Sequence, residues 1–175
     1  HAIPAGLTPT VVMTFKPLPA LPKDLRERGA RVITTLDIRW ANCYIKATTL
    51  LPNVLAKNDA LRRGYDDVIF VTAGGEVREC TSANIFLVTG ARLLIPPRNE
   101  SILHGVTQGF LIECAEAIGV GVREEPIPVE SLRRADEVFM SGTAAEVLAI
   151  TSIDDRQVGD GRVGPITQRL YDEFL

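Results

Sequence analysis

Short apolar runs separated by glycine-containing turns constrain the fold of this 175-residue chain more than any other feature. Val68–Thr72 and Glu76–Cys80 flank a turn that contains two glycines, and Ala83–Val88 and Arg92–Ile95 flank Gly90. Pairs of this kind are typical of antiparallel hairpins. We therefore expect these four runs to form an antiparallel meander.

Helical spacing interrupts the strand-like runs at four places. The patterns predict helices over Ala47–Arg63, Val106–Ile118, Val129–Arg134 and Ile166–Phe174, and further strands over Arg31–Leu36, Val120–Arg123, Glu137–Ser141 and Val147–Ile153. In the first helix, Leu50, Val54 and Leu61 fall on one face. Because strands dominate and helices interrupt them, we expect an α+β fold with a barrel-like, mostly antiparallel sheet and flanking helices.

The first two dozen residues differ from the rest in their proline content. Prolines stand at positions 4, 9, 17, 19 and 22 around a short β-like run, Val11–Lys16. Proline cannot donate to the hydrogen bonds of a central strand, so the run is compatible only with an edge strand. We expect residues 1–24 to be a connector with one edge strand, and residues 25–175 to form a domain.

Charge and composition exclude several classes of function. The net charge of -3 and a pI near 5.5 do not favour a nucleic-acid partner. The longest apolar runs, such as Val68–Val71, are far shorter than the about 20 residues of a membrane-spanning helix. Three cysteines without a C-x-x-C pair indicate neither a disulfide framework nor a metal site, and we expect a cytoplasmic protein.

A glycine motif near the end of the chain requires a separate interpretation. Gly159–Gly164 matches G-x-G-x-x-G, which in a nicotinamide enzyme opens a helix after a parallel strand. Pro165 follows at once, and the chain ends at Leu175 before another strand could follow. We expect a plain loop before a terminal helix and no hydride transfer.

Lys46 stands in an uncharged stretch, Cys43–Thr49. These uncharged surroundings predict partial burial of its amine, which would lower the pKa of the amine and free it to attack a carbonyl group. A lysine in front of a helix is also commonly an ordinary solvated side chain. Spacing alone leaves both interpretations open.

Two short turns are rich in small residues that could admit an anion. Ser141–Glu146 lies between two apolar runs, and Gly105-Val106-Thr107 opens a predicted helix, where free backbone amides favour phosphate. A tight turn and an ordinary first-turn threonine are the simpler alternatives. Glu79, if buried, needs a cationic partner. We expect His104 at the surface, and no Ser/His/Asp spacing supports a hydrolase.

Five stretches in order resemble the class IV (fold type IV) pyridoxal-phosphate aminotransferases across nearly the whole chain: Asp37–Lys46, Asn53–Lys57, Glu79–Phe86, Ile102–Thr107 and Glu137–Glu146. The stretch around Lys46 looks most like D-amino acid aminotransferases. Phe139–Glu146 and Gly161–Thr167 look more like branched-chain aminotransferases. The resemblance makes residues 25–175 the cofactor-binding C-terminal domain and residues 1–24 an interdomain connector.

The resemblance also implies roles for individual residues. Lys46 would bind pyridoxal 5'-phosphate covalently and carry the proton, and Glu79 would face the pyridine nitrogen. The remaining cofactor contacts would come from Leu103 against the ring and from Val106, Thr107, Gly142 and Thr143 around the phosphate. Substrate contacts would come from Thr143, Ala144 and His1, and no metal is implied.

The function implied is transamination between an amino acid, with D-amino acids favoured, and a 2-oxo acid. A branched-chain L-amino acid aminotransferase and an aminodeoxychorismate lyase are the alternatives within the family. Family members are usually homodimers, and an N-terminal domain that this sequence lacks completes their site. A catalytically incomplete domain with a binding or assembly role is therefore a further alternative.

Overall fold

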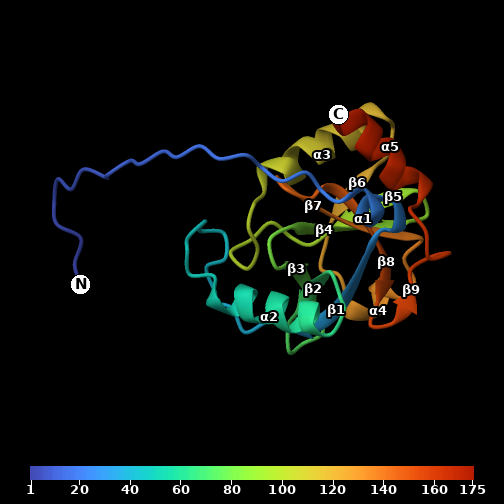
Figure 1. Cartoon of the computed structure of the whole chain (residues 1–175), viewed down its shortest axis with the longest axis horizontal. Helices are drawn as coiled ribbons and strands as arrows, with labels where there is room; N and C mark the ends of the chain where they lie inside the picture. The colour runs from blue at the N-terminus through green and yellow to red at the C-terminus, as the bar shows by residue number, and fades with distance from the viewer.

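A curved mixed sheet with helices on its outer faces forms the body of the protein in the computed structural model of residues 1–175 (Figure 1). The helices are α1 (Lys23–Arg28), α2 (Leu51–Arg62), α3 (Val106–Ala117), α4 (Val129–Leu132) and α5 (Pro165–Phe174). The strands are β1 (Ala30–Leu36), β2 (Asp67–Val71), β3 (Val77–Cys80), β4 (Asn84–Thr89), β5 (Arg92–Ile95), β6 (Val122–Glu124), β7 (Glu137–Gly142), β8 (Glu146–Ile153) and β9 (Arg156–Gln157).

The strands follow the order β3-β2-β1-β8-β7-β4-β5-β6, and β9 pairs with β8. β1 is parallel to both β2 and β8, and β5 is parallel to β6, whereas the other pairs are antiparallel. The backbone amide of Cys80 donates to the carbonyl of Ala83 at 2.8 Å, which draws β3 toward β4. The sheet thus curls into a half-barrel, and the α+β, barrel-like prediction is confirmed.

Both predicted hairpins are present, but the continuous meander is wrong. β2 pairs with β3, and β4 pairs with β5, each antiparallel. In the sheet order, however, β1, β8 and β7 lie between the two hairpins. The local turn signals fixed the hairpins, whereas strands distant in sequence supply the pairing partners between them.

Alternating residues of the strands build cores on both faces of the sheet, and a third, smaller core lies under α2. The inner core contains Val32, Ile69, Leu87, Met140 and Ile150, all buried inside the curve. The outer core contains Phe86, Phe139, Leu111 and Leu170 and joins the sheet to α3 and α5. Successive side chains of a strand point to opposite faces, so a sheet covered on both faces has apolar residues on both. The outer core fixes α3 against β7.

Helix α2 covers the sheet on another side, against β1 and β2 (Figure 1). Pro52 lies in its first turn, where its missing amide proton costs no hydrogen bond. Ala60 is its buried residue, while Leu50, Val54 and Leu61 are each about half exposed. The shared face predicted from their spacing therefore does not pack on this sheet.

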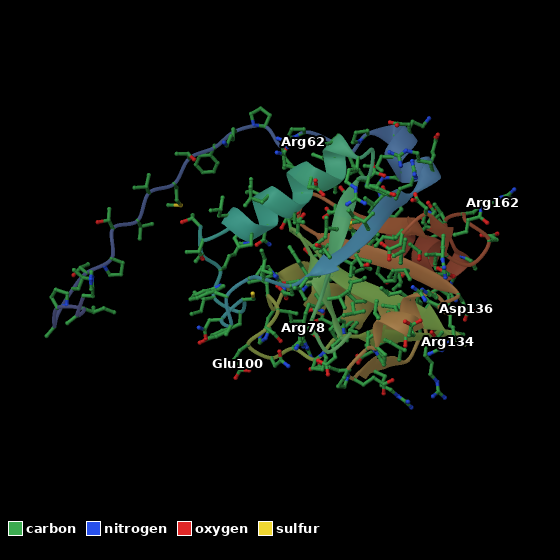
Figure 2. All side chains as sticks on the ribbon, turned by 90° about the horizontal axis from the view of Figure 1, so that it is seen from below. Arg62, Arg78, Glu100, Arg134, Asp136 and Arg162 are labelled. Atoms are coloured by element: carbon green, nitrogen blue, oxygen red, sulfur yellow. The ribbon has the colours of Figure 1, made fainter.

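Residues 1–22 contain no helix or strand and are almost entirely exposed. Figure 1 shows this segment running away from the body, and Figure 2 shows its side chains apart from the others. The predicted edge strand Val11–Lys16 is therefore wrong, because a strand needs a hydrogen-bonded neighbour and none lies beside this segment. The proposed division at residue 24 stays a prediction. No helix of the structure has the length and apolar character needed to cross a membrane.

The glycine motif Gly159–Gly164 is confirmed as a loop before the terminal helix α5. The Glu137 carboxylate accepts hydrogen bonds from the backbone amides of Ile166 and Thr167, at 2.9 and 2.7 Å. These are the amides that a pyrophosphate at this helix would use. A side chain of the protein already satisfies them.

Candidate active site

A cavity of about 420 Å³ opens where four segments distant in the sequence meet. Its walls come from the loop between β1 and α2, the end of β3 with the turn into β4, the start of α3, and the end of β7. The cavity brings together seven of the predicted site residues: Lys46, Glu79, Leu103, Val106, Thr107, Gly142 and Thr143. His104 also lines it, as an exposed residue, in agreement with the predicted surface position.

Two predicted substrate contacts lie elsewhere. Ala144 follows Thr143 in the turn between β7 and β8 but does not line the cavity. His1 is exposed at the far end of the extended N-terminal segment, remote from the cavity walls (Figure 1). The structure therefore does not bring His1 together with the other predicted residues.

Lys46 lies in the loop that leads from β1 to α2. Two backbone hydrogen bonds hold this loop. The Asp37 amide donates to the Val71 carbonyl oxygen at 2.8 Å, and the Tyr44 amide donates to the Glu100 carbonyl oxygen at 3.2 Å. The Lys46 side chain is exposed in the chain as it stands, so the predicted partial burial of the amine is wrong for this structure. The uncharged neighbours of Lys46 do not cover it because the loop forms only one wall of the cavity.

Glu79 is buried on β3, with 6% of its surface exposed. Its carboxylate accepts hydrogen bonds from Arg39 at 2.5 Å, from the Leu103 backbone amide at 3.1 Å, and from the Asn84 side-chain amide at 3.2 Å. Burial raises the pKa of Glu79 above its ordinary value, while the positive charge of Arg39 and the amide of Leu103 act in the opposite direction. The expectation of a cationic partner is confirmed.

Arg39 lines the cavity beside Glu79 and was not predicted from the sequence. The Asp37 carboxylate accepts two hydrogen bonds from its guanidinium, at 2.9 and 2.8 Å. The guanidinium also lies over the Phe70 ring, 4.4 Å from its centre, which is a favourable cation–π position. The available signal was the Asp37-x-Arg39 spacing on the loop after a β-branched strand, but sequence alone does not show that the loop reaches β3.

Two turns, at the start of α3 and at the end of β7, line the same cavity. No side chain caps the start of α3, so the amides of its first turn lack an internal partner. Gly105 precedes this turn, and a Cβ there would come within 2.2 Å of Asn84 Oδ1. At the second turn, a Cβ on Gly142 would come within 3.1 Å of the Ser82 carbonyl oxygen. Both glycines therefore keep the walls close together.

A polar side chain without a partner lies beneath these turns. Ser141 is fully buried, lines the cavity, and its Oγ atom has no hydrogen-bond partner. A buried hydroxyl left in this state costs free energy, so such groups call for an explanation. The structure contains no group of three or more His, Cys, Asp or Glu side chains placed to hold a metal ion.

Residues 2–153 match the family described as amino-transferase class IV. D-alanine aminotransferase of Staphylococcus haemolyticus is 37% identical over 174 residues, covering 99% of this chain and 61% of the relative. The enzyme of the same name from Listeria innocua is 38% identical over 157 residues, covering 89% of this chain and 54% of the relative.

Solved structures give the same family. Branched-chain amino acid aminotransferase from Escherichia coli has a TM-score of 0.73 and 35% identity, covering 82% of this chain and 50% of that one. The Thermobaculum terrenum enzyme of that name, solved in its PLP form, has a TM-score of 0.80 and 30% identity, covering 89% of this chain and 53% of that one. This chain therefore belongs to the class IV aminotransferases, as the resemblance predicted. It spans 61% and 54% of the length of the two D-alanine aminotransferases.

Proposed function

We propose that this chain forms the pyridoxal-phosphate-binding part of an aminotransferase that moves an amino group between an amino acid and a 2-oxo acid. One observation carries the proposal: an amine, a buried carboxylate and two amide-rich turns face a single cavity of about 420 Å³. A cofactor with an aldehyde, a ring nitrogen and a phosphate needs these three kinds of group. The family membership and the names of the relatives support the same activity.

The walls of the cavity fit the phosphate of such a cofactor. The uncapped first turn of α3, with Val106 and Thr107, offers backbone amides to an anion. Gly142 and Thr143 offer a second turn beside it, and the partnerless Ser141 hydroxyl lies beneath. We propose that these residues hold the phosphate and that Leu103 packs against the ring.

Lys46 is proposed as the residue that binds the cofactor and carries the proton. The chain has four lysines, Lys16, Lys23, Lys46 and Lys57, and of these Lys46 lines the cavity. Lys57 is instead paired with Asp67 at 2.7 Å, and Lys23 with Glu27 at 3.6 Å. When bound, pyridoxal phosphate supplies an aldehyde that condenses with amines and a ring that accepts electrons. The Lys46 amine would hold the cofactor through that aldehyde and, once the amino group of the substrate has displaced it there, would be free to move the proton of the substrate carbon.

Glu79 is proposed to face the ring nitrogen of the cofactor. A buried carboxylate favours the protonated form of a neighbouring ring nitrogen, since the two opposite charges stabilise each other.

Thr143 and Ala144, in the turn between β7 and β8, are proposed to bind the substrate carboxylate through backbone amides. A substrate contact from His1 stays a prediction.

Two substrate classes are supported by different comparisons. The sequence relatives are named for D-alanine, which favours D-amino acids. The solved structures are named for branched-chain amino acids, which favours L-leucine-like substrates as the second candidate. Incubation with D-alanine or L-leucine, each with 2-oxoglutarate, separates the two by the amino acid that is consumed.

The same experiment tests the proposed function itself. Together with the residues proposed below to complete its site, the protein is expected to transfer the amino group with one of the two donors, and Lys46→Ala should abolish the transfer. Lys57→Ala is the matched control, since it removes a lysine that lies outside the cavity. Transfer that survives in Lys46→Ala contradicts the assignment. Release of pyruvate from aminodeoxychorismate in place of transfer would assign the lyase reaction instead.

We further propose that a second copy of the chain and additional residues complete the site. Leu51 and Leu55 of α2 are more than half exposed, and Trp40 and Tyr44 in the preceding loop are almost half exposed. Exposed apolar side chains gathered on one region are typical of surfaces that bind protein. The matched relatives, which are longer, support the same view.

A further inference from the structure

The acid that is proposed to face the cofactor belongs to a buried group of three charges. Asp37, Arg39 and Glu79 form two ion pairs, and the side chains of Arg39 and Glu79 are 4% and 7% exposed. Two carboxylates and one guanidinium leave one net negative charge. Buried charge without compensation is costly, so the group needs one more cation from the side of the cavity.

The hydrogen bonds of Glu79 leave one direction free. Arg39 occupies one carboxylate oxygen, Asn84 occupies the other, and the Leu103 amide lies within reach of both. An ionised carboxylate has about four acceptor positions. Three donors therefore leave one position, and Glu79 lines the cavity.

Other charged and titratable groups near Glu79 are placed differently. Lys46, Cys43 and His104 line the same cavity without a hydrogen bond to Glu79. Arg78, on the same strand, forms its ion pair with Glu76 at 3.2 Å. The cation that acts directly on Glu79 is therefore Arg39.

We propose that Arg39, clamped by Asp37 and stacked on Phe70, is a positioning residue that keeps Glu79 ionised and directs its free lone pair toward a protonated ring nitrogen. The inference rests on the proposed function, because it concerns the partner of Glu79 in that site. Arg39 also lines the cavity, but its hydrogen bonds go to Asp37, Glu79 and the Ser101 carbonyl oxygen, so it acts through Glu79. Its planar fork suits this role, since it can bind both carboxylates at once.

The first test uses the protein without added cofactor. The titration midpoint of Glu79 is followed by carboxyl-carbon NMR of labelled glutamate, with Glu79→Gln to assign the signal. Arg39→Gln is expected to raise the midpoint by about 1–3 pH units, the usual effect of removing an opposite charge at contact distance. Arg78→Gln is the matched control, at the position labelled in Figure 2, and should leave the midpoint unchanged.

A second variant keeps the test decisive if Arg39→Gln fails to fold. Arg39→Lys retains the charge but cannot bind Asp37 and Glu79 with one fork, so its Glu79 midpoint should lie above that of the parent protein. The proposal is overturned if the variant that folds has the same Glu79 titration midpoint as the parent protein.

The second test separates this inference from the proposed function. Pyridoxal phosphate added to the parent protein should produce a visible absorption band, and Arg39→Gln should shift the pH midpoint of that band while Arg78→Gln does not. Absence of any band in the parent contradicts the proposed function. In that case the titration of Glu79 in the first test still decides whether Arg39 acts on Glu79. A normal band in the parent with no shift in Arg39→Gln contradicts the inference alone.

Discussion

An exposed amine and a buried carboxylate face the same cavity, so the two groups lie in different environments. Lys46 remains accessible to an aldehyde, whereas Glu79 is held by Arg39, Asn84 and the Leu103 amide. Burial raises the pKa of Glu79 despite Arg39, so the folded protein binds a proton there more readily than the unfolded chain does. This proton linkage predicts a pH dependence of stability.

The stability that Glu79 contributes should fall as the pH rises. Because the folded-state pKa of Glu79 is raised, this stability begins to fall in the pH range where an ordinary carboxyl group titrates. It is lost completely above the folded-state pKa. The free energy of unfolding of Glu79→Gln, relative to the parent, should therefore increase with pH over this window. Urea unfolding at a series of pH values measures it, and Glu130→Gln, at an exposed site on α4, serves as control. A difference that is independent of pH contradicts the account.

The start of α3 depends on steric fit rather than on helix propensity. Gly105 packs so closely on Asn84 that a methyl group has no space, whereas Gly109, one turn later, has no atom within 4 Å of where a Cβ would stand. Asn84 also binds Glu79 and the Leu103 carbonyl oxygen, at 3.2 and 2.7 Å. The position of this helix start is thus coupled to the buried carboxylate.

Alanine at these two glycines should change stability in opposite directions. Gly105→Ala is expected to lower the free energy of unfolding by about 1–3 kcal/mol, since overpacking forces the backbone or Asn84 to move. Gly109→Ala is expected to raise it by about 0.5–1 kcal/mol, since alanine is the better helix former. Thermal or urea unfolding of both variants checks the pair, and equal effects would refute the steric explanation.

Local elements were largely predictable from the sequence, and their long-range pairing was not. The spacing and Gly119 place the end of the α3 helix within a residue of its observed end at Ala117, and the glycine turns locate both hairpins. The insertion of β1, β8 and β7 between those hairpins depends on pairing between distant residues, such as Val32 with Asp67, Ala30 with Ile150, and Asn84 with Ser141. Local patterns carry no information on such contacts.

The candidate site divides in the same way. Seven of the residues that the resemblance implied, among them Lys46 and Glu79, line one cavity, while their roles stay predictions. Arg39 was missed because its partner Glu79 lies forty residues away and the intervening loop has no regular structure. The exposure of Lys46 was missed because neighbours in sequence do not define what covers a side chain.

At the scale of the whole molecule, exposed apolar side chains outside residues 1–22 are concentrated on α2 and on the loop before it. Leu51 and Leu55 are one helical turn apart and both exposed, on a helix whose buried residue is Ala60. If a second copy covers this surface, charge there should separate the copies. The double variant Leu51→Glu, Leu55→Glu is therefore expected to sediment with half the mass of the parent protein.

Leu175→Glu, at an exposed apolar residue far along the chain, is the control for this substitution and should retain the parent's mass. Sedimentation velocity measures all three proteins. A parent that sediments as a single chain, or a double variant with unchanged mass, contradicts the proposed assembly.

Reductive trapping tests the central claim most directly. Protein mixed with pyridoxal phosphate is reduced with borohydride, digested, and the labelled peptide is identified by mass spectrometry. With only four lysines in the chain, the assignment is unambiguous. The label is predicted on Lys46, and a label on Lys16, Lys23 or Lys57, or no label at all, would contradict the account.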